Sequence, residues 1–175
     1  MDNISGIVDD SIVDGPGLRY TIFVQGCPHG CPECHNPQTH SFEENKRVTL
    51  GQLMSEIKEN PLLYGVTFSG GEPFCQPRPL AILGQQIKKA GMHLMCYSGY
   101  TYEQLLKRAE TEPDVAALLD VVDVLVDGRF VEALHDISLR FRGSSNQRLL
   151  DVPKSLAAKA PVWWEDEKVF ATHTM

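Results

Sequence analysis

Strand-like and helix-like segments alternate along most of this chain, and this alternation limits its fold more than any other feature of the sequence. Residues typical of strands occur at 19–24, 64–68, 93–97 and 121–126. Apolar residues at helical spacing occur at 50–57, 80–87, 101–110 and 114–119. Because parallel strands need crossover connections, the pattern predicts an α/β fold with a mostly parallel sheet. Weaker patterns predict strands at 148–152 and 162–164 and a short helix from Pro153.

The length and charge of the chain exclude several classes of protein. A chain of 175 residues corresponds to one domain with its own core. Its net charge of −7 disfavours binding to nucleic acid through the whole surface. We find no apolar run long enough for a transmembrane helix and no basic, apolar signal peptide at the N-terminus. We therefore expect a cytoplasmic protein, without nucleic-acid or membrane partners, whose cysteines are reduced.

Three cysteines lie close together in the loop expected from Gln25 to about Arg47. Cys27, Cys31 and Cys34 form a Cys-x3-Cys-x2-Cys run. Reduced thiolates grouped in this way favour an iron–sulfur cluster or a zinc site. Three ligands would leave one iron of a cluster open for a substrate, whereas zinc would need a fourth ligand such as a neighbouring histidine. Both interpretations stay open at this point. The two remaining cysteines, at positions 75 and 96, are interpreted as ordinary thiols, with Cys96 buried in a strand.

Two further polar segments follow predicted strands. Gly70, Gly71 and Glu72 come directly after the second strand, and Ser98 follows the third. Adjacent glycines allow close approach of the backbone to a ligand, and the glutamate could accept hydrogen bonds from an ammonium group. Thr101 is the predicted N-cap of the next helix. Because loops after parallel strands meet at one edge of the sheet, the sequence predicts one site formed by the cysteine loop and these two segments.

The cysteine run and the Gly-Gly-Glu segment together resemble the radical S-adenosylmethionine superfamily. The resemblance implies a partial, incomplete β/α barrel, with Cys27, Cys31 and Cys34 holding one 4Fe–4S cluster whose open iron binds S-adenosylmethionine. It implies contact of the methionine ammonium with Gly70, Gly71 and Glu72. It also implies adenosine contacts from Glu33, Cys34 and His35, and a ribose contact from Ser98. Glu33 stands where the wider family often has an aromatic residue against the adenine.

Segments that flank these motifs resemble activases of glycyl radical enzymes. They are 14–19, 25–27 and 34–37. Segments 123–130 and 142–148 resemble the branch that acts on anaerobic ribonucleotide reductase. The resemblance covers residues 4 to about 152 of one radical S-adenosylmethionine domain at 1–175, and leaves 153–175 unassigned. It implies an oxidoreductase that receives an electron from flavodoxin or ferredoxin and forms a glycyl radical on the glycyl radical subunit of that reductase.

Two other functions remain open from the sequence. One is activation of another glycyl radical enzyme, such as pyruvate formate-lyase, and the other is a non-catalytic zinc-binding module.

Charged residues outside the two motifs lead to three further predictions. Arg19 is expected to be a solvated charge at a strand start, and Asp127 either ends a strand in a turn or faces the site. Arg140, Arg142 and Arg148 are a candidate docking surface for an acidic partner.

Overall fold

The computed structural model describes residues 2–11, 17–26, 46–129 and 146–164. The strands are β1 (Asp2–Ser11), β2 (Arg19–Val24), β3 (Lys46–Val48), β4 (Gly65–Gly70), β5 (His93–Tyr97), β6 (Val124–Asp127) and β7 (Arg148–Asp151). The α-helices are α1 (Leu50–Glu59), α2 (Pro77–Lys89), α3 (Tyr102–Ala109), α4 (Pro113–Val121) and α5 (Val152–Ala158). A short 3-10 helix, η2, spans Pro73–Cys75.

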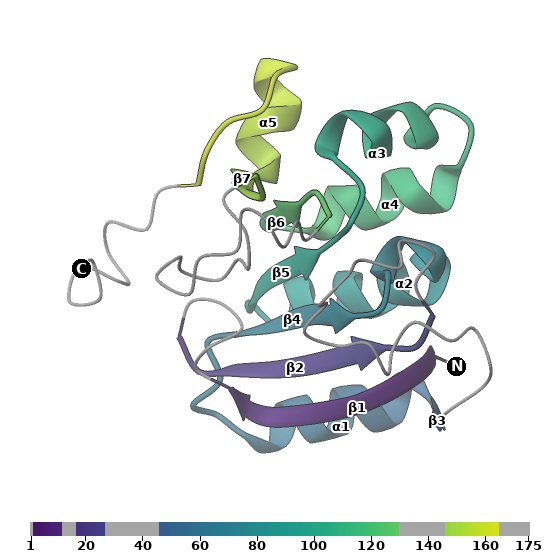
Figure 1. Cartoon of the computed structure of the whole chain (residues 1–175). Helices are drawn as coiled ribbons and strands as arrows, with labels where there is room; N and C mark the ends of the chain where they lie inside the picture. Colours follow the sequence, from purple (N-terminus) through teal and green to yellow (C-terminus); the bar gives the residue numbers. More distant parts are fainter. Residues whose placement is uncertain (1, 12–16, 27–45, 130–145, 165–175) are drawn as a thin grey trace.

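The strands form one mixed sheet in the order β3-β1-β2-β4-β5-β6-β7. Its centre is parallel, because β2, β4, β5 and β6 pair in the same direction. β1 and β3 add antiparallel strands at one side, and β7 adds one at the other. The predicted α/β class with a mostly parallel sheet is confirmed. Within the described residues β3 and β7 are the two edges and do not pair with each other, so the sheet is open (Figure 1).

Local sequence signals place most of these elements correctly. Thr49 caps α1 and Thr101 caps α3, each in a capping box with a glutamine three residues later. The predicted strand at 121–126 begins only at Val124, because Val121 still belongs to α4. The predicted strand at 162–164 is reduced to a single bridge from Trp163 to Leu150.

Sequence reasoning missed both strands at the first edge of the sheet. Its expected loop from Gln25 to about Arg47 overlaps β3. The other missed strand, β1, pairs with β2 through two register shifts, one between Ile4 and Gly6 and one between Val8 and Ser11. Such irregularities break the alternation of apolar and polar residues by which a strand is normally predicted.

The main core lies between one face of the sheet and the layer formed by α1, α2 and α4 (Figure 1). Side chains at alternate positions of the strands face this layer, among them Ile22 and Phe68, which are fully buried. A smaller apolar cluster of Met95, Val124 and Val126 forms from the intervening positions. The two clusters account for a sheet that is buried on both faces, as a parallel sheet requires. None of the described helices has the length and apolarity needed to cross a membrane.

Arg19 is fully buried, so the expectation of a solvated charge was wrong. Its Nε donates to Thr67 Oγ1 at 2.6 Å, and its Nη2 donates to the Val66 carbonyl at 2.7 Å. A longer bond of 3.4 Å joins Nη2 to the carbonyl of His93. Arg19 therefore links the amino ends of β2, β4 and β5. The loops that were predicted to form the site lie at the opposite, carboxyl ends of these strands.

Candidate active site at the carboxyl edge of the parallel strands

The Gly-Gly-Glu segment packs directly against the end of β2. Gly70 has a φ of +92°, and a Cβ at this position would lie 2.5 Å from the backbone nitrogen of Val24. The position therefore accepts only glycine without rearrangement. The Gly71 N–H donates to the Val24 carbonyl at 2.8 Å, and the Glu72 N–H donates to the Gly26 carbonyl at 2.7 Å. These bonds hold the loop beside Gly26, the residue that precedes Cys27 in the sequence.

The Glu72 carboxylate is fully buried and is surrounded by donors of the chain itself. Oε2 accepts from the Phe74 N–H at 3.0 Å and from the Ser98 hydroxyl at 2.9 Å. Oε1 accepts from the Gly99 N–H at 2.7 Å. The side chain thus joins the loop after β4 to the loop after β5. Burying a carboxylate is costly unless hydrogen bonds compensate it, and three such bonds are present here.

Ser98 is held in place by the same contact. Its hydroxyl donates to Glu72 and accepts from the Tyr100 N–H at 3.1 Å. Its own N–H donates to the Val126 carbonyl at 2.9 Å, which ties the loop to β6. The N-cap role of Thr101 is confirmed, since Thr101 Oγ1 accepts from the Gln104 N–H at 3.2 Å. The segment from Ser98 to Thr101 thus has two roles. Ser98 contacts the Gly-Gly-Glu loop, and Thr101 caps the start of α3.

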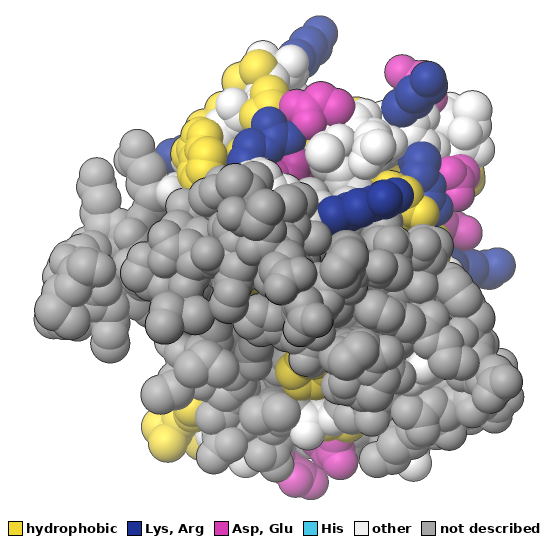
Figure 2. All heavy atoms as spheres, viewed as in Figure 1, with side chains coloured by type: hydrophobic (Ala, Val, Ile, Leu, Met, Phe, Trp, Pro, Cys, Tyr) yellow, Lys and Arg dark blue, Asp and Glu magenta, His cyan; other side chains and the backbone are white. Residues whose placement is uncertain are grey.

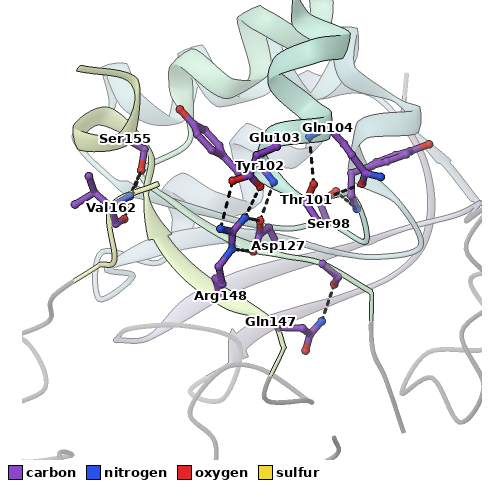
Figure 3. A network of polar contacts seen from close by, with 12 residues as sticks. Ser98, Thr101, Tyr102, Glu103, Gln104, Asp127, Gln147, Arg148, Ser155 and Val162 are labelled. Carbon is purple, nitrogen blue, oxygen red and sulfur yellow. Dashed lines mark hydrogen bonds and ion pairs between the residues drawn. The ribbon is translucent and has the colours of Figure 1, made fainter. Parts of the chain in front are cut away.

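Asp127 lies at the carboxyl end of β6 and is almost fully buried. Its Oδ2 accepts from the Tyr102 N–H, the first amide of α3, at 2.7 Å. Arg148 donates to the same carboxylate through Nε at 3.0 Å and through Nη2 at 2.5 Å (Figure 3). Nη2 of Arg148 also contacts Glu103 Oε1 at 2.6 Å. Asp127 therefore connects the start of α3 to β7. The prediction that it ends a strand is confirmed, because β6 ends at Asp127.

The charges of this network stabilise one another. Hydrogen bonding to Asp127 is the main cause that raises the pKa of the Arg148 guanidinium. The hydrogen bond from Arg148 is in turn the main cause that lowers the pKa of Glu103. The sequence predicted a docking surface at Arg140, Arg142 and Arg148. This prediction is corrected in part, because Arg148 forms ion pairs with Asp127 and Glu103 of the same chain. The other two arginines lie outside the described residues.

A polar cavity of about 420 Å³ opens beside this network. Its walls come from the loop after β5, the start of α3, the end of β6 and the start of β7. The lining residues are Gly99, Thr101, Glu103, Gln104, Asp127, Gly128, Arg129, Asn146 and Arg148. The cavity shares Gly99 with the segment that Glu72 holds. Sequence reasoning missed this cavity, because its walls meet only through the pairing of Asp127 with Arg148 across β6 and β7.

The structure brings together only part of the predicted site. Gly70, Gly71, Glu72 and Ser98 meet at one edge, as the sequence predicted. The predicted cluster ligands and adenosine contacts lie outside the described residues, namely Cys27, Cys31, Cys34, Glu33 and His35. Within the described ranges, no three His, Cys, Asp or Glu side chains are grouped so that they could hold a metal ion.

The remaining cysteines lie in the described part of the chain. Cys96 is fully buried in β5, as expected, and burial followed by the nearby charge of Glu72 raises the pKa of its thiol. Cys75 is exposed at the end of η2.

Comparison with known proteins identifies the class and then the family. A family model described as a 4Fe-4S single cluster domain matches residues 13–150. The chain therefore belongs to this class of iron–sulfur proteins.

Within the class the chain resembles named activating proteins over most of its length. It is 34% identical over 145 residues to the anaerobic ribonucleoside-triphosphate reductase-activating protein of Vibrio cholerae, which covers 78% of this chain and 89% of that protein. The corresponding protein of Escherichia coli is 35% identical over 144 residues, with 78% and 90% covered. The chain belongs to the family of anaerobic ribonucleoside-triphosphate reductase-activating proteins, and its predicted place among glycyl-radical-enzyme activases is confirmed.

A relative with a different name is also similar. The pyruvate formate-lyase-activating enzyme of Clostridium pasteurianum is 35% identical over 137 residues, which covers 73% of this chain and 56% of that protein. The chain thus spans about nine-tenths of the reductase-activating relatives but little more than half of this enzyme.

Proposed function

We propose that this protein activates an anaerobic ribonucleoside-triphosphate reductase. In this proposal it cleaves S-adenosylmethionine reductively at a 4Fe–4S cluster and forms a glycyl radical on the glycyl radical subunit of the reductase. The observation that carries the proposal is the contact of Glu72 with Gly26 on one side and with Ser98 on the other. This contact assembles the Gly-Gly-Glu loop at the point where the chain enters the cysteine run.

The chemistry of the residues at this edge fits a 4Fe–4S cluster and S-adenosylmethionine. The three cysteines that follow Gly26 are soft thiolate ligands of the type that hold iron–sulfur clusters. Cys27, Cys31 and Cys34 would hold the cluster, which would supply the electron that cleaves S-adenosylmethionine into methionine and a 5′-deoxyadenosyl radical able to take hydrogen from glycine. We place the adenosine contacts at Glu33, Cys34 and His35 and the ribose contact at Ser98.

The Gly-Gly-Glu loop would contribute its backbone to the cofactor. The Glu72 carboxylate already accepts three hydrogen bonds from Phe74, Ser98 and Gly99. Contact with the methionine ammonium therefore falls mainly to the backbone carbonyls around Gly70 and Gly71. Glu72 orients this backbone and the Ser98 loop before any ligand arrives, and such preorganisation reduces the entropy lost on binding.

The proposed architecture is a partial β/α barrel of the radical S-adenosylmethionine type. The open, mostly parallel sheet supports it, because the loops after β2, β4 and β5 all leave from one edge. We propose one domain over 1–175, with a core at about 4–152. Flavodoxin or ferredoxin is the proposed electron donor, in a cytoplasmic setting.

An anaerobic assay tests the proposed function directly. The purified chain is reconstituted with iron and sulfide, reduced, and supplied with S-adenosylmethionine, and 5′-deoxyadenosine is measured by chromatography. We expect product from the wild type and none from Cys31→Ala. Cys75→Ala removes an exposed thiol outside the run and serves as the matched control, with product expected. Glycyl radical formation on the reductase subunit is then followed by electron paramagnetic resonance.

The same assay separates the alternatives. A protein that takes up zinc instead of iron and forms no product contradicts the proposal and favours a binding module. A radical formed on pyruvate formate-lyase but not on the reductase subunit favours the other activase. Coverage favours the reductase, because the chain spans 89% of the Vibrio cholerae relative and only 56% of the pyruvate formate-lyase-activating enzyme.

A further inference from the structure

The segment that follows α5, residues 160–164, runs back along the outer side of β7. The Trp164 N–H donates to the Leu149 carbonyl at 2.9 Å, and the Asp151 N–H donates to the Val162 carbonyl at 2.8 Å. Among the described strands β7 is an edge of the sheet, so segment 160–164 supports it on the side away from β6. The segment follows the part of the chain that the 4Fe-4S family model matches, so membership of the family assigns it no role.

The turn that returns the chain to β7 is held by α5 itself. Lys159 ends the helix with a φ of +55°, a left-handed conformation that residues other than glycine rarely adopt. The Ala160 N–H donates to the Ser155 carbonyl at 3.2 Å. The Ser155 hydroxyl is buried and accepts from the Val162 N–H at 2.9 Å (Figure 3). Segment 160–164 is therefore fixed from two sides, by α5 and by β7.

Trp164 packs on the face of the sheet opposite the layer of α1, α2 and α4. It lies against the smaller apolar cluster of β5 and β6, as do the side chains of Tyr97 and Leu149. Its neighbour Trp163 lies on the other face, because it pairs with Leu150 of the main core. Trp163 is 51% exposed, and Figure 2 shows hydrophobic side chains at the surface around α5 and the segment after it. Of the two tryptophans, Trp164 is the one that packs against the smaller cluster.

A short series of contacts leads from Trp164 to the loop of Ser98. The Trp164 N–H bonds to Leu149 of β7, and Leu149 pairs with Val126 of β6. The Val126 carbonyl in turn accepts from the Ser98 N–H at 2.9 Å. The packing of the Trp164 ring on the cluster that contains Val126 follows the same route. The position of β7 therefore affects the position of Ser98.

A second connection passes through the residue that precedes Leu149. The Arg148 guanidinium donates to Asp127, and Asp127 accepts from the Tyr102 N–H at the start of α3. A displacement of β7 would therefore shift the start of α3 as well as the loop before it. Both ends of the segment from Ser98 to Tyr102 thus depend on where β7 lies.

We propose that Trp164 is a positioning residue, which fixes β7 from outside and thereby holds the Ser98 loop in the geometry that binds S-adenosylmethionine. The inference rests on the proposed function, because it concerns the cofactor of that reaction. Trp164 acts through Leu149 and Val126 and makes no contact of its own with the cofactor.

Amide hydrogen exchange of the purified full-length protein, followed by NMR without S-adenosylmethionine, tests the connection. We expect Trp164→Ala to speed exchange of the Ser98 and Tyr102 amides about tenfold, because their acceptors lose support. Trp164→Phe keeps a ring on the cluster and should stay within about threefold of the wild type. The Gly71 amide, which bonds to β2, should exchange at the same rate in all variants. Equal acceleration at Gly71 would mean general destabilisation and would contradict the proposal.

The matched control is Trp163→Ala, which removes the same ring from the adjacent position. We expect its Ser98 amide to exchange within about twofold of the wild type. Thermal unfolding of each variant shows whether it is folded, and Trp164→Leu replaces Trp164→Ala if the alanine variant is not. A Trp163→Ala variant that accelerates Ser98 as much as Trp164→Ala overturns the proposal.

Binding of S-adenosylmethionine is the second readout. It is measured by calorimetry on the reconstituted protein without reductant, so that the cofactor is bound but not cleaved. We expect Trp164→Ala to raise the Kd about fivefold, because part of the binding energy is used to order the Ser98 loop. Trp164→Phe and Trp163→Ala should bind within about twofold of the wild type. A folded Trp164→Ala variant with the Kd of the wild type refutes the positioning role.

Turnover separates positioning from loss of folded protein. In Trp164→Ala the KM for S-adenosylmethionine should rise with the Kd, while kcat stays within about twofold. A variant that is merely unfolded in part shows the opposite result, a lower kcat with the KM of the wild type. Failure of the proposed function is distinguishable, because the wild type itself would then form no 5′-deoxyadenosine, whereas the exchange rates would still report on the connection.

Discussion

The Glu72 carboxylate accepts a hydrogen bond from the Ser98 hydroxyl at 2.9 Å, across 26 positions of the sequence. This bond joins the loop after β4 to the loop after β5 at the carboxyl edge of the sheet. Two residues singled out for cofactor binding are therefore also partners of each other. A change at either one should disturb the position of the other.

Glu72→Gln should destabilise the fold and weaken binding of S-adenosylmethionine. Three donors face the carboxylate, and the amide group of glutamine would place its own N–H donors against at least one of them. Leaving a buried donor unsatisfied costs roughly 1–3 kcal/mol in the free energy of unfolding. Urea denaturation measures this cost, and Glu59→Gln in the exposed part of α1 is the control, with a change within about 0.5 kcal/mol. Equal stability of the two variants would show that Glu72 does not brace the site.

Gly70→Ala should be more harmful than alanine at Gly91 or at Gly51. Its φ of +92° disfavours a side chain, and a Cβ would lie 2.5 Å from the Val24 nitrogen. Gly91 has a φ of +79° but open space around a Cβ, so Gly91→Ala measures the backbone strain alone, about 1 kcal/mol. Gly51 in α1 has neither problem, and its replacement by alanine should stabilise by roughly 0.5–1 kcal/mol.

These three glycine variants are compared by chemical denaturation under one set of conditions. The expected order of stability is Gly51→Ala above the wild type, then Gly91→Ala, then Gly70→Ala. If Gly70→Ala and Gly91→Ala lost the same amount, the close approach of the loop to β2 would contribute nothing.

The Asp127–Arg148 pair should show strong coupling. Asp127 is nearly fully buried, whereas the Arg148 side chain keeps 27% of its exposure, so solvent screens the pair in part. We expect Asp127→Asn to destabilise by roughly 2 kcal/mol, less than for a fully buried pair. A double-mutant cycle with Arg148→Met measures the coupling energy, which we expect to be at least about 1 kcal/mol. Additive losses would mean that the two side chains act independently.

His93 should make the stability depend on pH. Burial, followed by the charge of Arg19, lowers the pKa of its imidazole to about 4. The unfolded chain takes up a proton near pH 6.5 that the folded chain binds only near pH 4. The free energy of unfolding therefore falls as the pH drops from 6.5 to 4, by as much as roughly 3 kcal/mol.

His93→Phe tests this pH dependence. The new ring stays beside Tyr64, which stacks on the imidazole with ring centroids 5.3 Å apart. The variant also removes Nδ1, which is buried without a hydrogen-bond partner. Urea midpoints at pH 7 and pH 5 should differ less for this variant than for the wild type. A pH dependence equal to that of the wild type would assign the effect to other groups.

Local patterns were sufficient for most helices and for the parallel strands. Helical spacing and capping residues such as Thr49 and Thr101 act over a few positions, so the sequence shows them directly. The strand β1 could not be predicted in this way, because its two register shifts are defined by pairing with β2. Arg19 was misjudged for a similar reason, since its partners Thr67 and Val66 lie 48 and 47 positions away.

The sequence by itself determined the class of fold, the grouping of three cysteines and the Gly-Gly-Glu segment, because these depend on residue type and spacing. Only the tertiary structure decided that Glu72 turns its carboxylate toward Ser98 and Gly99, and that Asp127 and Arg148 close one wall of a cavity. The physical reason is that these contacts join residues far apart in the chain. They form only when the crossover helices pack and bring the ends of β4, β5, β6 and β7 to neighbouring positions.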